Sequence, residues 1–289
     1  MSLSLTIDKF TKDLEHKDRS AFTIAAYRKD LEQLVDFLEN NKINLWEEVD
    51  LKVLNRFINK LINGNELSLK TISRKINSIR TFFKYLISQK IINENYALKL
   101  KHPKVSRHIP RVLTPFEYKA LRDTARTNIR LYTIIETLLQ TGIRIGELSR
   151  LTKDDITPDI TEMRIKAFSS NPERTIKINP QLQKTLEAYY KSDLCMKAQS
   201  KFVFFTRSGG SIFIRNIRHA IMRAFKSTGI KDAKVNDLRN TFIVYQLEHG
   251  MRIDSLARII GHKQQSTTEY YLELIQTRSA KSTNSITPL

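Results

Sequence analysis

Two arginines, a histidine and a pair of tyrosines are the residues of this chain whose types and positions could support chemistry. Arg144 follows a glycine in "TGIRIGEL", and Arg239 lies in "DLRNTF" at the start of an otherwise apolar helix. A buried arginine is costly unless it meets an anion, although Glu147 could simply pair with Arg144. His262 precedes two adjacent tyrosines in "GHKQQSTTEYYLEL". Taken singly, such an arginine more often belongs to a salt bridge, and such a histidine or tyrosine more often has a structural role.

Helices and one small antiparallel sheet are predicted to position these residues. A buried helix that ends at a glycine is typical of "IRLYTIIETLLQTG". A hairpin is indicated by the period-two alternation of "TEMRIKA" and "ERTIKIN" around polar "FSSNP", and a third strand could be "KFVFF". Four helices are then expected in "SIFIRNIRHAIMRAFKSTG", "NDLRNTFIVYQLEHG", "DSLARIIGH" and "STTEYYLEL". This half of the chain is therefore predicted to be α+β, and the whole chain mainly α with a small antiparallel sheet.

The first hundred residues are predicted to form a helical domain. Apolar residues recur at helical spacing over residues 23–40, with Ser20 or Thr23 as the cap, and again over residues 68–91. Residues 101–112 contain two prolines and no acid, so they are predicted to be a basic interdomain linker. Thr114 then opens a new helix, with proline at its first position and glutamate at its third. The predicted domains are residues 1–100 and 113–289, the second with a C-terminal tail.

The charge of the chain is strongly positive and unevenly distributed. The net charge is +19, and residues 51–112 alone carry 14 basic and 2 acidic side chains. A polyanionic partner is expected, either nucleic acid or an anionic membrane surface, and so one-sided a block is typical of a binding face. Nine basic side chains are predicted to contact DNA phosphates. Five lie on exposed helix faces, namely Lys70, Arg74, Lys75, Arg80 and Lys84, and four lie in the linker, namely Lys101, Lys104, Arg107 and Arg111.

Length and composition limit the remaining possibilities. A chain of 289 residues fits one large or two medium domains. The sequence contains no run of 18 apolar residues that could span a membrane, and no signal sequence is expected in "MSLSLTIDKF". Cys195 is the single cysteine, which excludes an internal disulfide and a cysteine-cluster metal site. A cytoplasmic protein, associated with the nucleoid, is expected.

Together, "TGIRIGEL", "DLRNTF" and "GHKQQSTTEYY" resemble the motifs of the tyrosine recombinases, the phage-integrase and Xer-like site-specific recombinases. The resemblance covers nearly the whole chain. It implies that the first domain is a core-binding domain and that residues from about 113 onward form a catalytic domain. The family's nucleophile usually lies nine residues after the histidine of this motif, which implies that Tyr271 attacks DNA while Tyr270 packs or supports.

The resemblance also implies a mechanism and partners. Tyr271 would form a covalent 3′-phosphotyrosyl link, while Arg144, Arg239 and His262 would hold the scissile phosphate, with no metal or cofactor. The phenol would need a lowered pKa or a proton acceptor to react near neutrality. The expected partners are double-stranded DNA with inverted-repeat arms and further copies of the chain in a tetramer on two DNA sites. A second recombinase or an accessory protein is a further candidate partner. The segment after Tyr271 would dock onto a neighbouring subunit.

Two positions depart from the family pattern. Asn236 stands where members commonly carry a histidine, and asparagine cannot accept a proton. Ser169 stands where the lysine that protonates the leaving 5′ oxygen is usual, so Lys166 is the nearest substitute, unless it is an ordinary exposed strand lysine, and Lys177 is a poorer one. These departures keep two alternatives open, a DNA-binding accessory factor with weak or no strand transfer and a type IB topoisomerase-like activity. The presence of Arg144, Arg239, His262 and Tyr271 together favours an enzyme over an accessory factor. The separate basic N-terminal domain and the small size favour a recombinase over a topoisomerase, which would use the same chemistry.

Overall fold

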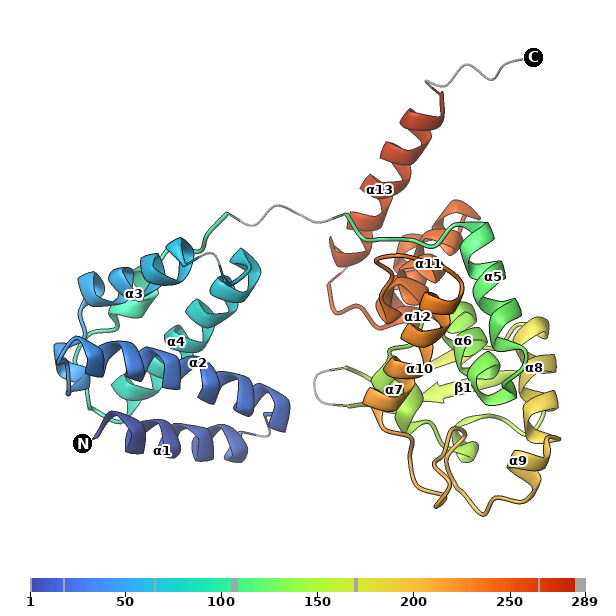
Figure 1. The fold of residues 1–289 in the computed structure, drawn as a ribbon, viewed down its shortest axis with the longest axis horizontal. Helices are drawn as coiled ribbons and strands as arrows, with labels where there is room; N and C mark the ends of the chain where they lie inside the picture. The colour runs from blue at the N-terminus through green and yellow to red at the C-terminus, as the bar shows by residue number, and fades with distance from the viewer. Residues whose placement is uncertain are drawn as a thin grey trace. The chain divides into compact units, whose positions relative to one another are not determined.

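Two compact units make up the chain, Met1–Arg107 and His108–Leu289, and each has its own hydrophobic core. The computed structural model describes residues 2–17, 19–64, 66–104, 109–168, 171–264 and 266–283 (Figure 1). The division falls inside the predicted linker. Among the described residues, no helix has the length and apolar character needed to cross a bilayer.

The first unit consists of helices. Its four α-helices are α1 (Leu3–His16), α2 (Ala21–Asn40), α3 (Leu51–Asn63) and α4 (Leu69–Ser88), with short 3-10 helices at Trp46–Glu48 and Tyr96–Lys99 (Figure 1). Ser20 caps α2 and Ser68 caps α4, each by accepting a hydrogen bond from the backbone N–H three residues later. The predicted apolar stripe of α4 is confirmed, because Ile72, Ile76, Ile79, Phe83 and Leu86 are fully buried.

A buried charge cluster joins α2 to α4 in this unit. Asp30 of α2 is 1% exposed and accepts hydrogen bonds from Lys75 at 2.9 Å, from Ser78 at 2.7 Å and from both Nη atoms of Arg74. The expectation that the bases of α4 all lie on exposed faces is therefore wrong for Lys75, which is only 5% exposed. A buried ammonium needs a carboxylate partner, and that partner lies 45 residues away in the sequence.

The second unit is α+β, as predicted. In order along the chain, its elements are α5 (Pro115–Ala125), α6 (Ile129–Thr141), α7 (Ile145–Arg150), a 3-10 turn (Lys153–Asp155), β1 (Glu162–Ile165), β2 (Arg174–Lys177), α8 (Pro180–Tyr190), α9 (Asp193–Met196), α10 (Ile214–Ser227), α11 (Val235–Glu248), α12 (Ile253–Ile260) and α13 (Ser266–Thr283) (Figure 1). The strands pair antiparallel, with Glu162 opposite Lys177 and Ile165 opposite Arg174, which confirms the hairpin.

The third strand expected in "KFVFF" does not form. Phe202 and Phe205 make only isolated bridges, to Thr152 and Ser211. Val203 and Phe204 are fully buried, and Val203 donates a single backbone hydrogen bond to Leu151. A short apolar run is compatible with either a strand or a buried loop, and here the run fills the core as a loop.

Two ends of elements matter for the candidate site. Helix α6 ends at Gly142, whose φ of 63° lies in the left-handed region, and a Cβ there would lie 2.4 Å from the Phe242 ring. Helix α13 begins at Ser266 and continues to Thr283, beyond the end of the predicted "STTEYYLEL" helix. The later turns of α13 project away from the body of the unit (Figure 1).

Candidate active site

Arg144 and Arg239 converge on the C-terminal end of α12. Arg144 precedes α7 and donates from Nη1 to the carbonyl of Ile260 at 3.4 Å and from Nη2 to the carbonyl of Gly261 at 3.1 Å. Arg239 of α11 donates from Nη2 to the same Ile260 carbonyl at 2.7 Å. The last carbonyls of a helix have no partner within the helix, so they are available to hold these guanidinium groups. Two arginines far apart in the sequence thus meet at one point.

Arg239 is a buried cation that bonds to carbonyls. Its side chain is 5% exposed, and its Nη1 donates to the carbonyl of Gly142, where the left-handed turn places that oxygen. Burial, helped by the neighbouring charge of Arg144, lowers the pKa of Arg239 to about 9. The group still remains charged at neutral pH. Within the described residues Arg239 makes no ion pair with a carboxylate, so its charge is available to an incoming anion.

Glu147 supports Arg144 and is itself held by Arg174, which was not identified as a site residue from the sequence. Glu147 accepts from the Arg144 backbone N–H at 2.8 Å and from its Nη1 at 3.3 Å, so the pairing considered from the sequence does exist. Arg174 of β2 binds Glu147 through two N–H groups, at 3.0 and 2.7 Å, and donates to the carbonyl of Ile259. Burial raises the pKa of Glu147, but the hydrogen bonds from Arg174 and Arg144 outweigh burial and hold it below its usual value.

His262 follows this cluster directly and is neutral. Burial, together with the positive charges of Arg239 and Arg144, lowers the pKa of His262 to about 4. Its Nδ1 lies 2.9 Å from the hydroxyl oxygen of Thr268, a fully buried residue of α13. The imidazole ring and the Tyr271 ring are nearly parallel, with centroids 6.4 Å apart. The motif histidine and tyrosine therefore lie beside one another.

The hydroxyl of Tyr271 is buried and bonded to an amide. The Tyr271 side chain is 8% exposed and donates to Oδ1 of Asn240 at 2.9 Å. Asn236 does not reach the phenol directly, because its Nδ2 donates to the same Asn240 oxygen at 3.2 Å. Burial raises the pKa of Tyr271, and the charge of Arg239 only partly opposes this. The lowered phenol pKa expected from the sequence is therefore not found in the protein without DNA.

Lys166 lies apart from this cluster, close to the start of the hairpin loop. It forms an ion pair with Asp155 at 2.9 Å and donates to the hydroxyl of Thr152 at 3.3 Å. Its side chain is 54% exposed and lines a cavity that also reaches Glu147. Ser169, which occupies the position of the usual lysine, lies outside the described residues.

The nine predicted DNA contacts have different environments. Five of them, Lys70, Arg74, Lys84, Lys101 and Lys104, are exposed. Arg74, although exposed, is already paired with Asp30, and Arg80 donates to three backbone carbonyls, those of Ala97, Leu98 and Leu100. Arg111 pairs with Glu117 at 2.6 Å, and Arg107 lies outside the described residues. With Lys75 buried, the exposed lysines remain the best candidates for phosphate contact.

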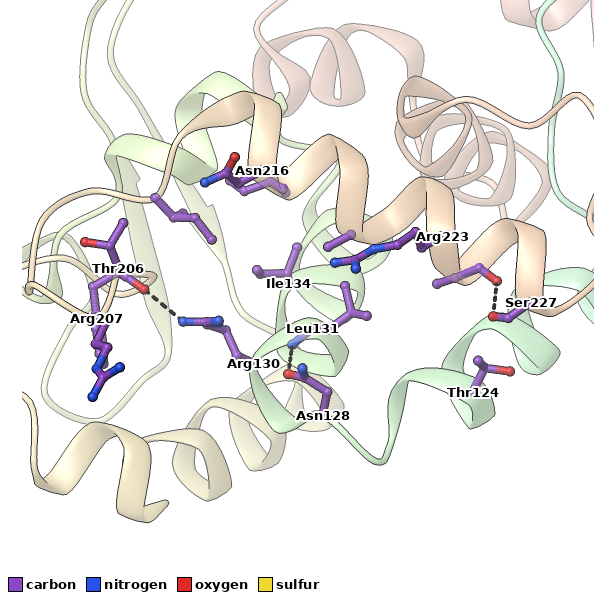
Figure 2. A pocket seen from close by; sticks show the side chains of 15 residues that line it. Thr124, Asn128, Arg130, Leu131, Ile134, Thr206, Arg207, Asn216, Arg223 and Ser227 are labelled. Carbon is purple, nitrogen blue, oxygen red and sulfur yellow. Dashed lines mark hydrogen bonds between the residues drawn. The ribbon is translucent and has the colours of Figure 1, made fainter.

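A cationic cavity surrounds the converging arginines. It is lined by Arg144, Asn236 and Arg239 together with Arg218, Lys234 and several apolar side chains. A second cavity uses another face of α10, through Asn216, Arg223 and Ser227, as Figure 2 shows. Arg130 in that second cavity donates to the carbonyl of Phe205 at 3.0 Å. None of the predicted catalytic side chains lines the second cavity, so the first is the candidate active site.

Comparison with protein families and relatives gives a consistent result. Residues 111–278 match the model of the phage integrase family, and residues 7–90 match the phage integrase N-terminal SAM-like domain. A tyrosine recombinase of Pseudothermotoga lettingae is 30% identical over 274 residues, covering 93% of this chain and 93% of the relative. The tyrosine recombinase XerC of Roseiflexus castenholzii is 28% identical over 280 residues, covering 93% of this chain and 88% of the relative.

Solved structures with the same fold include two recombinases bound to DNA. A lambda integrase (residues 75–356) dimer on a COC′ core site aligns with a TM-score of 0.76 and 16% identity, covering 92% of this chain and 97% of that one. The XerH recombinase in a post-cleavage complex with a palindromic difH substrate aligns with a TM-score of 0.78 and 16% identity, covering 97% of this chain and 84% of that one.

Proposed function

This chain belongs to the phage integrase family, and from that membership we infer that it is a site-specific DNA recombinase that cleaves and rejoins DNA through Tyr271. The observation that supports this function most directly is the meeting of Arg144 and Arg239 at the carbonyl of Ile260, beside His262 and the ring of Tyr271. Permanently charged guanidinium groups match the geometry of a phosphate, and a tyrosine next to them can attack its phosphorus.

The chemistry follows from these side chains. The Tyr271 oxygen forms a bond to phosphorus, the bond from phosphorus to the 5′ oxygen breaks, and rejoining reverses both changes. The phenol loses its proton, and the leaving 5′ oxygen gains one. Negative charge that gathers on the phosphate oxygens is balanced by Arg144 and Arg239, which makes a metal ion unnecessary for this step. His262, if Thr268 donates to its Nδ1, carries its proton on Nε2 and adds a neutral donor.

The phenol must lose a proton and the 5′ oxygen must gain one, and the described side chains around Tyr271 do not directly supply a base or an acid for these two transfers. Asn236 cannot take the phenol proton, and it reaches Tyr271 only through Asn240. Lys166 is the nearest candidate to protonate the 5′ oxygen, and for this it would have to leave Asp155. We propose that DNA binding draws Lys166 from Asp155 toward the scissile phosphate. Without a dedicated base, strand cleavage is expected to be slow near neutrality.

The proposed substrate is double-stranded DNA with inverted-repeat arms. Lambda integrase and XerH, which share this fold, were solved on DNA, and a tetramer of lambda integrase was solved on a Holliday junction. We propose the same kind of assembly here, in which α13, whose later turns project from the body of the unit, docks onto a neighbouring subunit (Figure 1). A second recombinase or accessory protein fits this assembly, and the nucleoid in the cytoplasm is the proposed place of action.

The test is covalent trapping. The protein is incubated with a pool of nicked duplexes that carry randomised inverted repeats of about one helical turn, so that cleavage releases a short strand and traps the adduct. The wild-type protein and Tyr270→Phe should form the adduct, whereas Tyr271→Phe should form none while still binding DNA. An adduct that persists in Tyr271→Phe and disappears in Tyr270→Phe would show that Tyr270, and not Tyr271, is the nucleophile.

Two other functions are less favoured by family membership and are separated by a second assay. A DNA-binding accessory factor would bind the selected duplex without forming any adduct. A type IB topoisomerase-like enzyme would relax supercoiled DNA without joining partners from two sites. Exchange of flanking DNA between two labelled copies of the selected site is the result expected for a recombinase.

A further inference from the structure

A hydrogen bond links the Tyr271 hydroxyl to the side chain of Asn240. It joins α13 to α11 across 31 residues of sequence, at 2.9 Å, and both side chains are buried, 8% and 5% exposed. The Tyr271 ring packs in a small apolar cluster with Val112, Phe242 and Leu274. A buried hydroxyl that donates to a buried amide is held firmly, because breaking the bond would leave both groups unsatisfied.

The orientation of the Asn240 amide is fixed by two pure acceptors. Its Nδ2 donates to the carbonyl of Arg111 at 3.1 Å and to a carboxylate oxygen of Asp237 at 3.3 Å. A flipped amide would place Oδ1 against both acceptors, so Oδ1 must face Tyr271 and the Nδ2 of Asn236. Asn240 therefore offers the phenol an acceptor and keeps the proton on Tyr271.

The Arg111 carbonyl belongs to a segment that is tied to α11 at successive residues. The backbone N–H of Leu113 donates to the Thr241 hydroxyl at 2.9 Å, next to the contact between Arg111 and Asn240. Val112, between these two anchors, is buried in the same apolar cluster as Tyr271. The segment through which the chain enters its second unit thus reaches the nucleophile through one side chain.

Charged and titratable groups lie near Tyr271 on the elements that pack around it. Arg239 and Asp237 act on it from α11 and Tyr270 from α13, while His262 lies beside its ring and Arg111 lies on the entering segment. We propose that Asn240 is a positioning residue that stores the Tyr271 hydroxyl in a protonated resting position, and that the Arg111 carbonyl holds Asn240 in this orientation. The proposal depends on Tyr271 being the nucleophile.

Two measurements test the proposal with Asn240→Ala and a matched control, Asn216→Ala, on the exposed face of α10. The first is the ultraviolet titration of Tyr271 without DNA, obtained as the difference between each protein and the same protein carrying Tyr271→Phe. The second is the single-turnover rate of adduct formation across pH at saturating trapped duplex. Asn240→Ala should lower the titration midpoint of Tyr271 and speed adduct formation roughly 2- to 10-fold, the worth of one hydrogen bond, with unchanged DNA affinity.

A second variant guards against a folding defect in Asn240→Ala. Thr241→Val removes the acceptor of the Leu113 N–H but leaves Asn240 in place, so it should change both measurements in the same direction by a smaller factor. A slower adduct rate in Asn240→Ala at unchanged affinity, or a Tyr271 titration equal to that of Asn216→Ala, would overturn the proposal. Failure of the wild-type protein to form any adduct would instead contradict the proposed function. The titration would still test whether Asn240 holds the proton on Tyr271.

Discussion

At the scale of single residues, burial is the main cause that sets the protonation states of Tyr271 and His262 beside the two arginines. Burial is the largest cause that raises the pKa of Tyr271, and burial is also the largest cause that lowers the pKa of His262 to about 4. Both groups are therefore neutral in the protein without DNA at neutral pH. An attacking phenolate must be generated as DNA binds, against the desolvation cost and with the help of Arg239.

The first residue-scale prediction concerns Asn236. Because neither Asn236 nor Asn240 can accept a proton, adduct formation by the wild-type protein should rise steadily from neutral to alkaline pH. Asn236→His should accelerate adduct formation near neutrality by roughly 10-fold or more and shift the profile to lower pH, because general-base help is typically worth 10²–10⁴-fold. Single-turnover cleavage of the trapped duplex across pH checks this. A flat wild-type profile with no gain in Asn236→His would mean that another group already acts as the base.

The second residue-scale prediction concerns acid stability. The pKa of His262 in the folded protein, about 4, lies below its usual value near 6.5, so the unfolded chain binds a proton that the folded chain does not. The stabilisation is complete above pH ~6.5 and is lost as pH falls toward 4. His262→Gln should therefore lose less stability than the wild-type protein over this range in urea unfolding. Equal losses in the two proteins would contradict the pKa shift.

At the scale of elements, the helices and strands that local sequence patterns determine could be predicted from the sequence. Helical spacing and capping residues predicted α2, α4 and α5, and period-two alternation predicted the β1–β2 hairpin. Contacts between distant elements could not be predicted, because no local pattern carries them. Asn240 lies within the "DLRNTF" motif and Arg174 within the predicted strand "ERTIKIN", but neither position carries a local signal of its contacts. Their roles depend on partners in α13 and α7.

The element-scale prediction concerns the buried pair of Asp30 and Lys75. Asp30→Ala would leave the Lys75 ammonium buried without its carboxylate, which should destabilise the first unit by about 3–5 kcal/mol. The control is Asp36→Ala, at an exposed position of the same helix, which should change stability by less than about 0.5 kcal/mol. Thermal or urea unfolding of the intact chain measures both. Equal stabilities of the two variants would show that Lys75 finds water when Asp30 is removed.

At the scale of the whole molecule, the structure shows which basic residues of the chain are left available to contact DNA. The basic block of residues 51–112 indicated a DNA-binding face, but three of the five DNA contacts predicted on α4 are engaged within the first unit, namely Arg74, Lys75 and Arg80. The sequence alone could not separate these from Lys70 and Lys84, because Asp30 and the backbone carbonyls that engage them lie on other elements.

The corresponding prediction compares two pairs of lysines. Lys70→Glu with Lys84→Glu should weaken binding to a trapped duplex and reduce the slope of log affinity against log salt by roughly 2, because two phosphate contacts release their counterions. Lys12→Glu with Lys29→Glu makes the same change of net charge on exposed positions of α1 and α2 and should leave the slope nearly unchanged. Similar slopes for both pairs would show that net charge alone, and not the α4 face, determines binding.

The central claim is that Tyr271 becomes covalently attached to DNA at a phosphate held by Arg144 and Arg239. The most direct measurement is mass spectrometry of the trapped adduct after protease and nuclease digestion, which identifies the modified residue and the attached nucleotide. The predicted result is a nucleotide joined to Tyr271 through its 3′ phosphate. Arg239→Ala should lower the rate of adduct formation roughly 10²–10³-fold at unchanged DNA binding. A nucleotide attached to any other residue, or an adduct rate that is unaffected by Arg239→Ala, would contradict this mechanism.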